Sequence, residues 1–191
     1  MNIDENMSKK TILCIIGTRP EAIKMAPVIW ELKKESWANV RVLATAQHRE
    51  MLDQMLALFD IQADLDLNIM KANQSLSELT SRLIEKMDGV IQAEKPDMII
   101  AQGDTTTVFA AALSCFYHRI PFAHVEAGLR THDLYYPFPE EANRVLTAQL
   151  TTLHFAPTVT SHKALLKEGT SGLSVSLRNT KTGLPSAGAS S

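Results

Sequence analysis

The sequence has few cysteines and no long apolar run, and each absence argues against a class of protein. The two cysteines among its 191 residues, Cys14 and Cys115, lie in apolar stretches, which favours buried thiols over a disulfide framework. No apolar run approaches the roughly eighteen residues that a membrane-spanning helix needs, and the start MNIDENMSKK is polar and acidic. We therefore expect no secretion, no membrane partner and a cytoplasmic location.

A strong excess of charge of one sign is also missing. The chain has 19 Lys and Arg residues against 21 Asp and Glu residues, a formal net charge of -2 at pH 7. This balance argues against general binding of polyanions, so no nucleic-acid partner is expected. Any recognition of phosphate must then depend on a few well-placed cations. A chain of this length can fold as one ordinary domain without a disulfide or a structural metal ion.

What the sequence does contain is an alternation of strand-like and helix-like segments. Five short apolar runs suit strands that are buried on both faces: 11–16, 40–44, 98–101, 121–125 and 153–156. Segments with helical spacing lie between and after them: 22–34, 50–59, 75–94, 106–118, 140–151 and 160–167. The alternation predicts an α/β fold with a Rossmann-like parallel sheet and helices on both of its faces.

Polar and charged residues follow four of the five predicted strands. They occupy positions 17–19, 45–48, 102–104 and 126–128, beside glycine or alanine. In parallel sheets covered by helices, ligands bind beyond the carboxyl ends of the strands. We therefore expect one edge of the sheet to carry a ligand site.

The segment GTRPE after the first predicted strand contains one cation, and Lys24, one turn into the following helix, adds a second at this edge. Gly17 lets the backbone approach a ligand, the helix start directs free N–H groups outward, and Arg19 and Lys24 could bind a pyrophosphate. Alternatively, both cations are solvated surface charges and Pro20 simply begins the helix. The segment has neither the three glycines of the dinucleotide fingerprint nor the Gly-Lys-Ser/Thr ending of the phosphate loop.

Three carboxylates belong to the same predicted edge. Asp104 could cap the following helix or act in catalysis, and the local sequence favours neither interpretation. His124 and Glu126 should point the same way from their strand, but no third ligand at a suitable spacing supports a metal site, and none is expected. Glu140 could simply stabilise the first turn of a helix. Together, Asp104, Glu126 and Glu140 are the kind of set that divides acid from base catalysis.

The composition of the chain divides it into three parts. Residues 1–10 form a polar segment, and residues 11–168 form the predicted Rossmann-like domain. Residues 169–191 are rich in Ser, Gly and Thr and have no apolar period, which predicts a poorly ordered or aberrant tail.

Six longer motifs occur in order along residues 10–168. They are GTRPEAIKMAPVI, TAQHREMLDQML, QGDTTTVFAAALS, HVEAGLRT, YPFPEEANR and HFAPT. In these motifs the chain closely resembles the bacterial non-hydrolysing UDP-N-acetylglucosamine 2-epimerase family. The resemblance implies the amino-terminal half of a two-domain fold of the glycosyltransferase-B type. It also implies interconversion of UDP-N-acetylglucosamine and UDP-N-acetylmannosamine for cell-envelope polysaccharide, without a cofactor and usually by a homodimer.

The same resemblance implies roles for individual residues. The family's reaction eliminates UDP to form a 2-acetamidoglucal, then adds UDP back while a proton reaches the opposite face of C2. Asp104, Glu126 and Glu140 would be the acid and base carboxylates, although the sequence does not assign the C2 proton to one of them. Arg19 and Lys24 would steady the diphosphate, where charge develops as UDP leaves.

Two further expectations follow from the resemblance. Gln47 and His48 match the region where the family binds a second, activating substrate molecule, whereas without the resemblance His48 would be an ordinary surface histidine. Family members are about twice as long as this chain, well beyond one domain, so a carboxyl-terminal UDP-binding domain would be missing. We therefore expect a truncated chain that is inactive alone. The alternatives are a non-catalytic fragment that pairs with a carboxyl-half polypeptide and a hydrolysing UDP-N-acetylglucosamine 2-epimerase.

Overall fold

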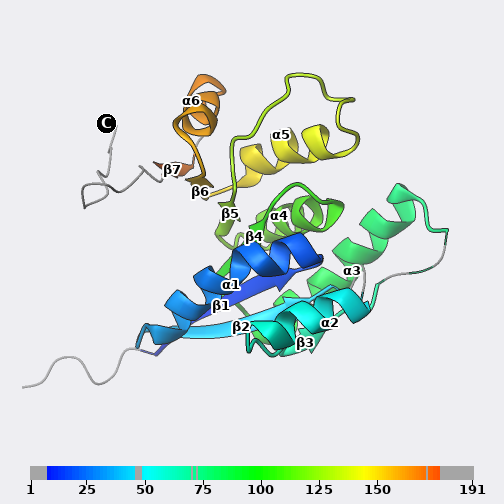
Figure 1. Cartoon of the computed structure of the whole chain (residues 1–191), viewed down its shortest axis with the longest axis vertical. Coiled ribbons are helices and arrows are strands. Elements are labelled where there is room, and N and C mark those ends of the chain that lie inside the picture. Colours follow the sequence, from blue (N-terminus) through cyan, green and yellow to red (C-terminus); the bar gives the residue numbers. More distant parts are fainter. Residues whose placement is uncertain (1–7, 46–48, 70, 72, 171, 177–191) are drawn as a thin grey trace, which may run out of the picture.

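A single parallel sheet forms the centre of the protein, which a computed structural model describes over residues 8–45, 49–69, 71, 73–170 and 172–176. The order of its strands is β3-β2-β1-β4-β5-β6-β7 (Figure 1). The strands are β1 (Lys10–Ile16), β2 (Ala38–Ala44), β3 (Leu65–Asp66), β4 (Met98–Gln102), β5 (Phe122–Val125), β6 (Leu153–Ala156) and β7 (Leu173–Ser176). Every neighbouring pair is parallel, so the predicted α/β class and sheet type are confirmed.

Helices cover both faces of the sheet. They are α1 (Arg19–Lys34), α2 (Arg49–Leu58), α3 (Leu76–Glu94), α4 (Thr106–His118), α5 (Glu140–Leu150) and α6 (Val159–Lys167). The side chains of β1 alternate between two cores: Leu13 and Ile15 pack with α3 and α4, whereas Cys14 and Ile16 pack with α1 and α2. Burial on both faces explains why the central strands form continuous apolar runs in the sequence.

Polar caps define where the helices begin. Helix α3 begins with a capping box, because Ser75 Oγ accepts a hydrogen bond from the Glu78 amide at 3.2 Å and Glu78 Oε2 accepts one from the Ser75 amide at 2.7 Å. Helix α1 has a second capping box, in which Thr18 and Glu21 are the partners. These contacts satisfy amide groups that have no acceptor within the helix.

The two cysteines occupy the two cores of the sheet. Cys14 in β1 and Cys115 in α4 are free and buried, as the sequence predicts. Burial raises the pKa of each thiol to about 12, so both are neutral, apolar side chains at physiological pH. Among the described residues, none of the helices combines the length and apolar character needed to cross a membrane.

The structure contains two strands that the sequence pattern does not predict. β3 has only two residues, too few to show a pattern. β7 lies inside the predicted tail, so that prediction is wrong for residues 173–176, which pair with β6. The sequence signal for β7 is weak because its apolar side chains lie at the edge of the core, where Leu173 is 71% and Val175 is 37% exposed. The predictions for residues 1–7 and 177–191 lie outside the described residues.

Close packing between the loop after β5 and helix α6 generates a test of the fold. Gly128 has a φ of 87°, and an added Cβ would lie 2.3 Å from the Ser161 carbonyl oxygen and 2.9 Å from Leu165 Cγ. We predict that Gly128→Ala lowers the free energy of unfolding by about 2–4 kcal/mol, because it combines left-handed backbone strain with overpacking. Urea unfolding measures this change.

Gly89→Ala is the matched control. Gly89 is exposed within α3, and a Cβ added there meets no atom within 4 Å. This substitution should raise the free energy of unfolding by about 0.5–1 kcal/mol, because alanine has the higher helix propensity. Equal effects of the two substitutions would contradict the packing of Gly128 against α6.

Candidate functional site

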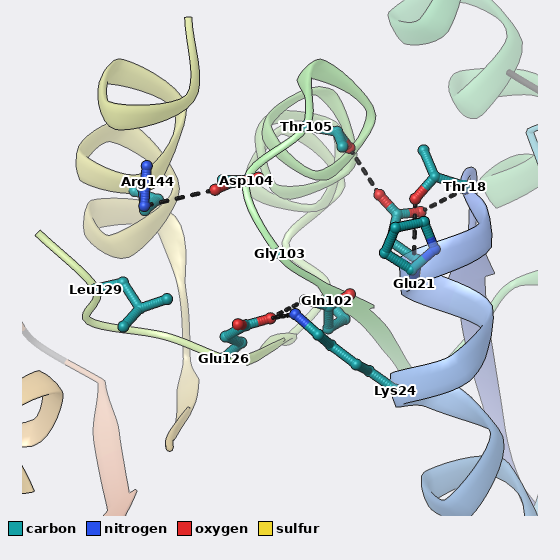
Figure 2. A pocket seen from close by; sticks show the side chains of 11 residues that line it. Thr18, Glu21, Lys24, Gln102, Gly103, Asp104, Thr105, Glu126, Leu129 and Arg144 are labelled. Carbon is teal, nitrogen blue, oxygen red and sulfur yellow. Dashed lines mark hydrogen bonds and ion pairs between the residues drawn. The ribbon is translucent and has the colours of Figure 1, made fainter. Parts of the chain in front are cut away.

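A pocket of about 400 Å³ opens at the carboxyl ends of β1, β4 and β5. Loops after these strands form its floor, and helices α1 and α5 contribute to its sides (Figure 2). The lining residues are Thr18, Pro20, Glu21, Lys24, Gln102, Gly103, Asp104, Thr105, Glu126, Leu129 and Arg144. Its size lies within the range of small-molecule sites, and its position agrees with the ligand edge predicted from the strand ends.

One oxygen of Glu126 binds two donors from two different elements. Lys24 Nζ of α1 lies 2.5 Å from Glu126 Oε2, and Gln102 Nε2 at the end of β4 donates to the same oxygen. Figure 2 shows Lys24 extending across the pocket to reach this carboxylate. Among the described residues, no hydrogen bond reaches Glu126 Oε1. The arrangement holds the carboxylate in place and leaves its second oxygen available to a ligand.

Asp104 lies on the opposite side of the pocket and contacts α5. Its Oδ2 lies 3.5 Å from Arg144 NH1, and its backbone carbonyl accepts a hydrogen bond from Asn143 Nδ2 at 2.9 Å. Partial burial raises the pKa of Asp104, Arg144 opposes this rise, and the negative charges of Glu140 and Glu126 add to it. A carboxyl group with a raised pKa is better able to hold and deliver a proton near neutral pH.

The interpretation of Asp104 as a helix cap is wrong. The N-cap of α4 is Thr105, whose Oγ1 accepts a hydrogen bond from the Val108 amide at 3.4 Å. The side chain of Asp104 is therefore not needed to begin the helix, and its ion pair is with Arg144 instead.

Not every predicted site residue lines the pocket. Lys24, Asp104 and Glu126 do, whereas Arg19 and Glu140 do not. Arg19 is the exposed first residue of α1, and Glu140 is the half-buried first residue of α5, near enough to Asp104 to raise its pKa.

Two other predicted positions cannot be placed. Gln47 and His48, expected at a second substrate site, lie outside the described residues.

The pocket also contains residues that the sequence analysis does not single out. Glu21 is buried, and its carboxylate lies on the wall between α1 and α4. Its capping-box spacing from Thr18 was a usable signal, because T-x-x-E before an apolar run predicts a helix start. Gln102 is the last residue of β4, and its position at the end of a predicted strand was the signal for it. Arg144 and Asn143 reach the site only through the packing of α5 against α4, for which the local sequence has no signal.

The buried ring of His124 supports the backbone of Gly103 in the pocket lining. Its Nε2 lies 2.7 Å from the Gly103 carbonyl oxygen, and burial lowers the pKa of His124 to about 4. The ring is therefore neutral at physiological pH, with Nε2–H donating to Gly103 just before Asp104.

Glu126 lies one residue beyond the end of β5, with a φ of 67°, so the alternation of strand side chains does not extend to it. Within the described ranges, no three His, Cys, Asp or Glu side chains are arranged to hold a metal ion.

The fold and the pocket together define a Rossmann-like domain with a candidate ligand pocket at the carboxyl edge of its sheet. The family model described as UDP-N-acetylglucosamine 2-epimerase matches residues 30–177. The chain belongs to the UDP-N-acetylglucosamine 2-epimerase family, as its motifs predict.

Two relatives illustrate the similarity. A UDP-N-acetylglucosamine 2-epimerase of Neisseria meningitidis is 59% identical over 157 residues, which are 82% of this chain and 42% of the relative. The crystal structure of UDP-GlcNAc 2-epimerase from Neisseria meningitidis bound to UDP-GlcNAc has a TM-score of 0.80 and 58% identity, over 83% of this chain and 44% of that one. The chain thus spans less than half the length of these relatives.

A more distant structure supports the fold class alone. MurG of Acinetobacter baumannii matches 80% of this chain and 42% of its own, with a TM-score of 0.59 and 12% identity. The domain therefore has the architecture of one half of a glycosyltransferase-B-type fold, as the resemblance implies.

The charges around Asp104 predict that two substitutions shift its pKa in opposite directions. Arg144→Gln should raise the pKa of Asp104 further, because it removes the cation that stabilises the carboxylate. Glu126→Gln should lower the pKa of Asp104, because it removes a like charge. A carbon-13 NMR titration of the Asp104 carboxyl group measures both shifts.

Arg41→Gln serves as the control for this titration. Arg41 pairs with Asp64 at 3.7 Å and with Glu94 at 3.4 Å and does not line the pocket. Its replacement should leave the pKa of Asp104 unchanged. Shifts of the same sign in the Arg144 and Glu126 variants would contradict the electrostatic arrangement of the pocket.

Proposed function

We propose that this chain is the amino-terminal half of a non-hydrolysing UDP-N-acetylglucosamine 2-epimerase. The substrates would be UDP-N-acetylglucosamine and UDP-N-acetylmannosamine, precursors of cell-envelope polysaccharide. The observation that carries the proposal is the convergence of Asp104, Glu126 and Lys24 on one pocket at the ligand edge of the sheet. Support comes from the 59% identical relative and from the related structure that contains UDP-GlcNAc.

In the proposed reaction, the carboxyl groups move protons while UDP leaves and returns. A carboxylate removes the C2 proton, a double bond forms between C1 and C2, and the C1–O bond breaks with its electron pair leaving on UDP. The reverse addition places a proton on the opposite face of C2 as the UDP oxygen attacks C1. Asp104 and Glu126 have different partners and surroundings, which supports a division into acid and base. Glu140, beside Asp104, would be the third carboxylate of this set.

The cations and the start of α1 would receive the diphosphate. Lys24 lines the pocket, and the exposed Arg19 begins the helix whose N-terminus borders it. Both positions favour a group on which negative charge develops. Gln47 and His48 remain the proposed contacts of a second, activating substrate molecule.

Turnover would require a second wall for the pocket. Elimination proceeds efficiently where water is excluded and the leaving group is held. The pocket of this domain is bordered by loops and two helices on one edge of the sheet, and the relatives have more than half of their length outside the matched part. We therefore propose that the active species pairs this domain with a carboxyl-terminal, UDP-binding half, either as a complex of two polypeptides or within a homodimer. The reaction would take place in the cytoplasm and would need no cofactor.

The test is C2 exchange measured by proton NMR. The purified chain is mixed with the carboxyl-terminal half of the Neisseria meningitidis relative in D2O, and UDP-GlcNAc is added. We expect deuterium at C2 and formation of UDP-ManNAc. Asp104→Asn and Glu126→Gln should each slow the exchange by about 100-fold or more, because each removes a proton-transfer group.

Glu31→Gln is the control for these variants. Glu31 is an exposed residue of α1 that pairs with Lys34 at 2.6 Å and lies outside the pocket lining, so the variant should exchange at the wild-type rate. Release of free N-acetylmannosamine and UDP would instead identify a hydrolysing enzyme. Absence of exchange in a mixture shown by light scattering to form a complex would contradict the proposed activity.

A further inference from the structure

A single buried carboxylate joins the loops that begin two helices. Glu21 is the third residue of α1, and its Oε2 accepts hydrogen bonds from the amides of Gly17 at 2.5 Å and Thr18 at 3.0 Å. Its other oxygen, Oε1, accepts the hydroxyl proton of Thr105 at a donor–acceptor distance of 3.0 Å. Thr105 is 84 residues away in the sequence and is the N-cap of α4. Figure 2 shows the contacts of Glu21 with Thr18 and Thr105 on one wall of the pocket.

A local capping role does not account for this arrangement. Helix α3 has the same kind of capping box, in which Glu78 binds the amide and the hydroxyl of Ser75. Glu78 is exposed, whereas Glu21 is only 3% exposed and binds a residue of a second loop. Burial raises the pKa of Glu21 to about 7, against the opposing effect of its hydrogen bonds. Burying a carboxyl group costs free energy that a cap at the surface avoids, so the link to Thr105 needs a separate explanation.

Glu21 is tightly held between the loop before α1 and the loop before α4. A Cβ added to Gly17 would lie 2.6 Å from Thr45 Oγ1 and 3.2 Å from Glu21 Oε2, so the first loop closes tightly on the carboxylate. On the second loop, Thr105 Oγ1 donates to Glu21 while it accepts from the Val108 amide at 3.4 Å. A chain of contacts therefore runs from the amides before α1 to the first turn of α4.

We infer that Glu21 is a positioning residue, which fixes the N-termini of α1 and α4 relative to each other before a ligand binds. The inference rests on the proposed function for the identity of that ligand, a nucleoside diphosphate. Helix N-termini favour anionic groups through their free amides and dipoles. Glu21 thereby sets the distance between two such termini, one beside Lys24 and the other directly after Asp104. Both of its carboxyl oxygens accept hydrogen bonds from backbone and hydroxyl donors, so neither is directed to the ligand.

The first experiment needs no ligand. Amide hydrogen exchange at Gly17 and Thr18 is followed by NMR in the full chain and in its Thr105→Val and Thr105→Ser variants. Loss of a hydrogen bond to a buried carboxylate should accelerate exchange about tenfold in Thr105→Val, whereas Thr105→Ser keeps the hydroxyl and should exchange as the wild type does. Unchanged exchange in Thr105→Val would overturn the coupling between the two loops.

The second experiment measures UDP affinity by calorimetry at neutral pH, with the chain paired with the carboxyl-terminal half of the Neisseria meningitidis relative. Glu21→Gln and Thr105→Val should each raise the Kd about tenfold, and Thr105→Ser should restore it. Glu78→Gln is the matched control, because it removes the capping carboxylate of α3 without a link to another loop, and its Kd should equal that of the wild type. Unchanged affinity in Thr105→Val would overturn the positioning role.

One outcome separates this inference from the proposed function. If the wild-type chain paired with the carboxyl-terminal half does not bind UDP, the proposed ligand is wrong, and the exchange measurement still decides whether Glu21 couples the loops. If Glu21→Gln does not fold, Thr105→Val and Thr105→Ser carry the test, because both leave the capping box of α1 in place. A weaker affinity in Thr105→Val that Thr105→Ser does not restore would contradict the role of the hydroxyl.

Discussion

Parallel pairing of β1, β4 and β5 is the constraint on which the candidate site depends. Ile12 pairs with Met98, and Ile99 pairs with Phe122, so the three strands end at the same edge. The amide of Gly103 then donates to the Val125 carbonyl at 3.1 Å, which joins the loop before Asp104 to the loop of Glu126. Residues separated by more than 80 positions in the sequence, such as Thr18 and Asp104, therefore face the same pocket.

The pocket combines charged groups with neutral supports. Glu126 is held by Lys24 and Gln102, and Asp104 by Arg144, so each carboxylate has its own cationic or polar partner. Beneath them, burial keeps His124 neutral, and its ring supports the Gly103 carbonyl. A cationic ring at that position would alter the field at Asp104. The low pKa of His124 therefore keeps this ring from adding a positive charge beside the pocket across the physiological pH range.

The sequence predicts the sheet and the ligand edge well because both depend on local patterns. Continuous apolar runs identify buried strands, and Asp104 and Glu126 could be placed from the strand ends. Lys24 could be placed one turn into the helix that follows the first strand. The pattern fails where burial is weak or contacts are distant. β7 carries exposed apolar side chains, and the contact of Arg144 with Asp104 depends on the rotation of α5 against α4. The link between Glu21 and Thr105 likewise depends on how two loops meet, which no local spacing encodes.

The shortness of β3 has a consequence for self-association. A strand at the border of a sheet offers unpaired backbone groups to which another chain can add, and long flat borders promote aggregation. With only two residues, β3 presents few such groups on that side of the sheet. Continuation of the sheet into a second molecule through β3 is therefore disfavoured.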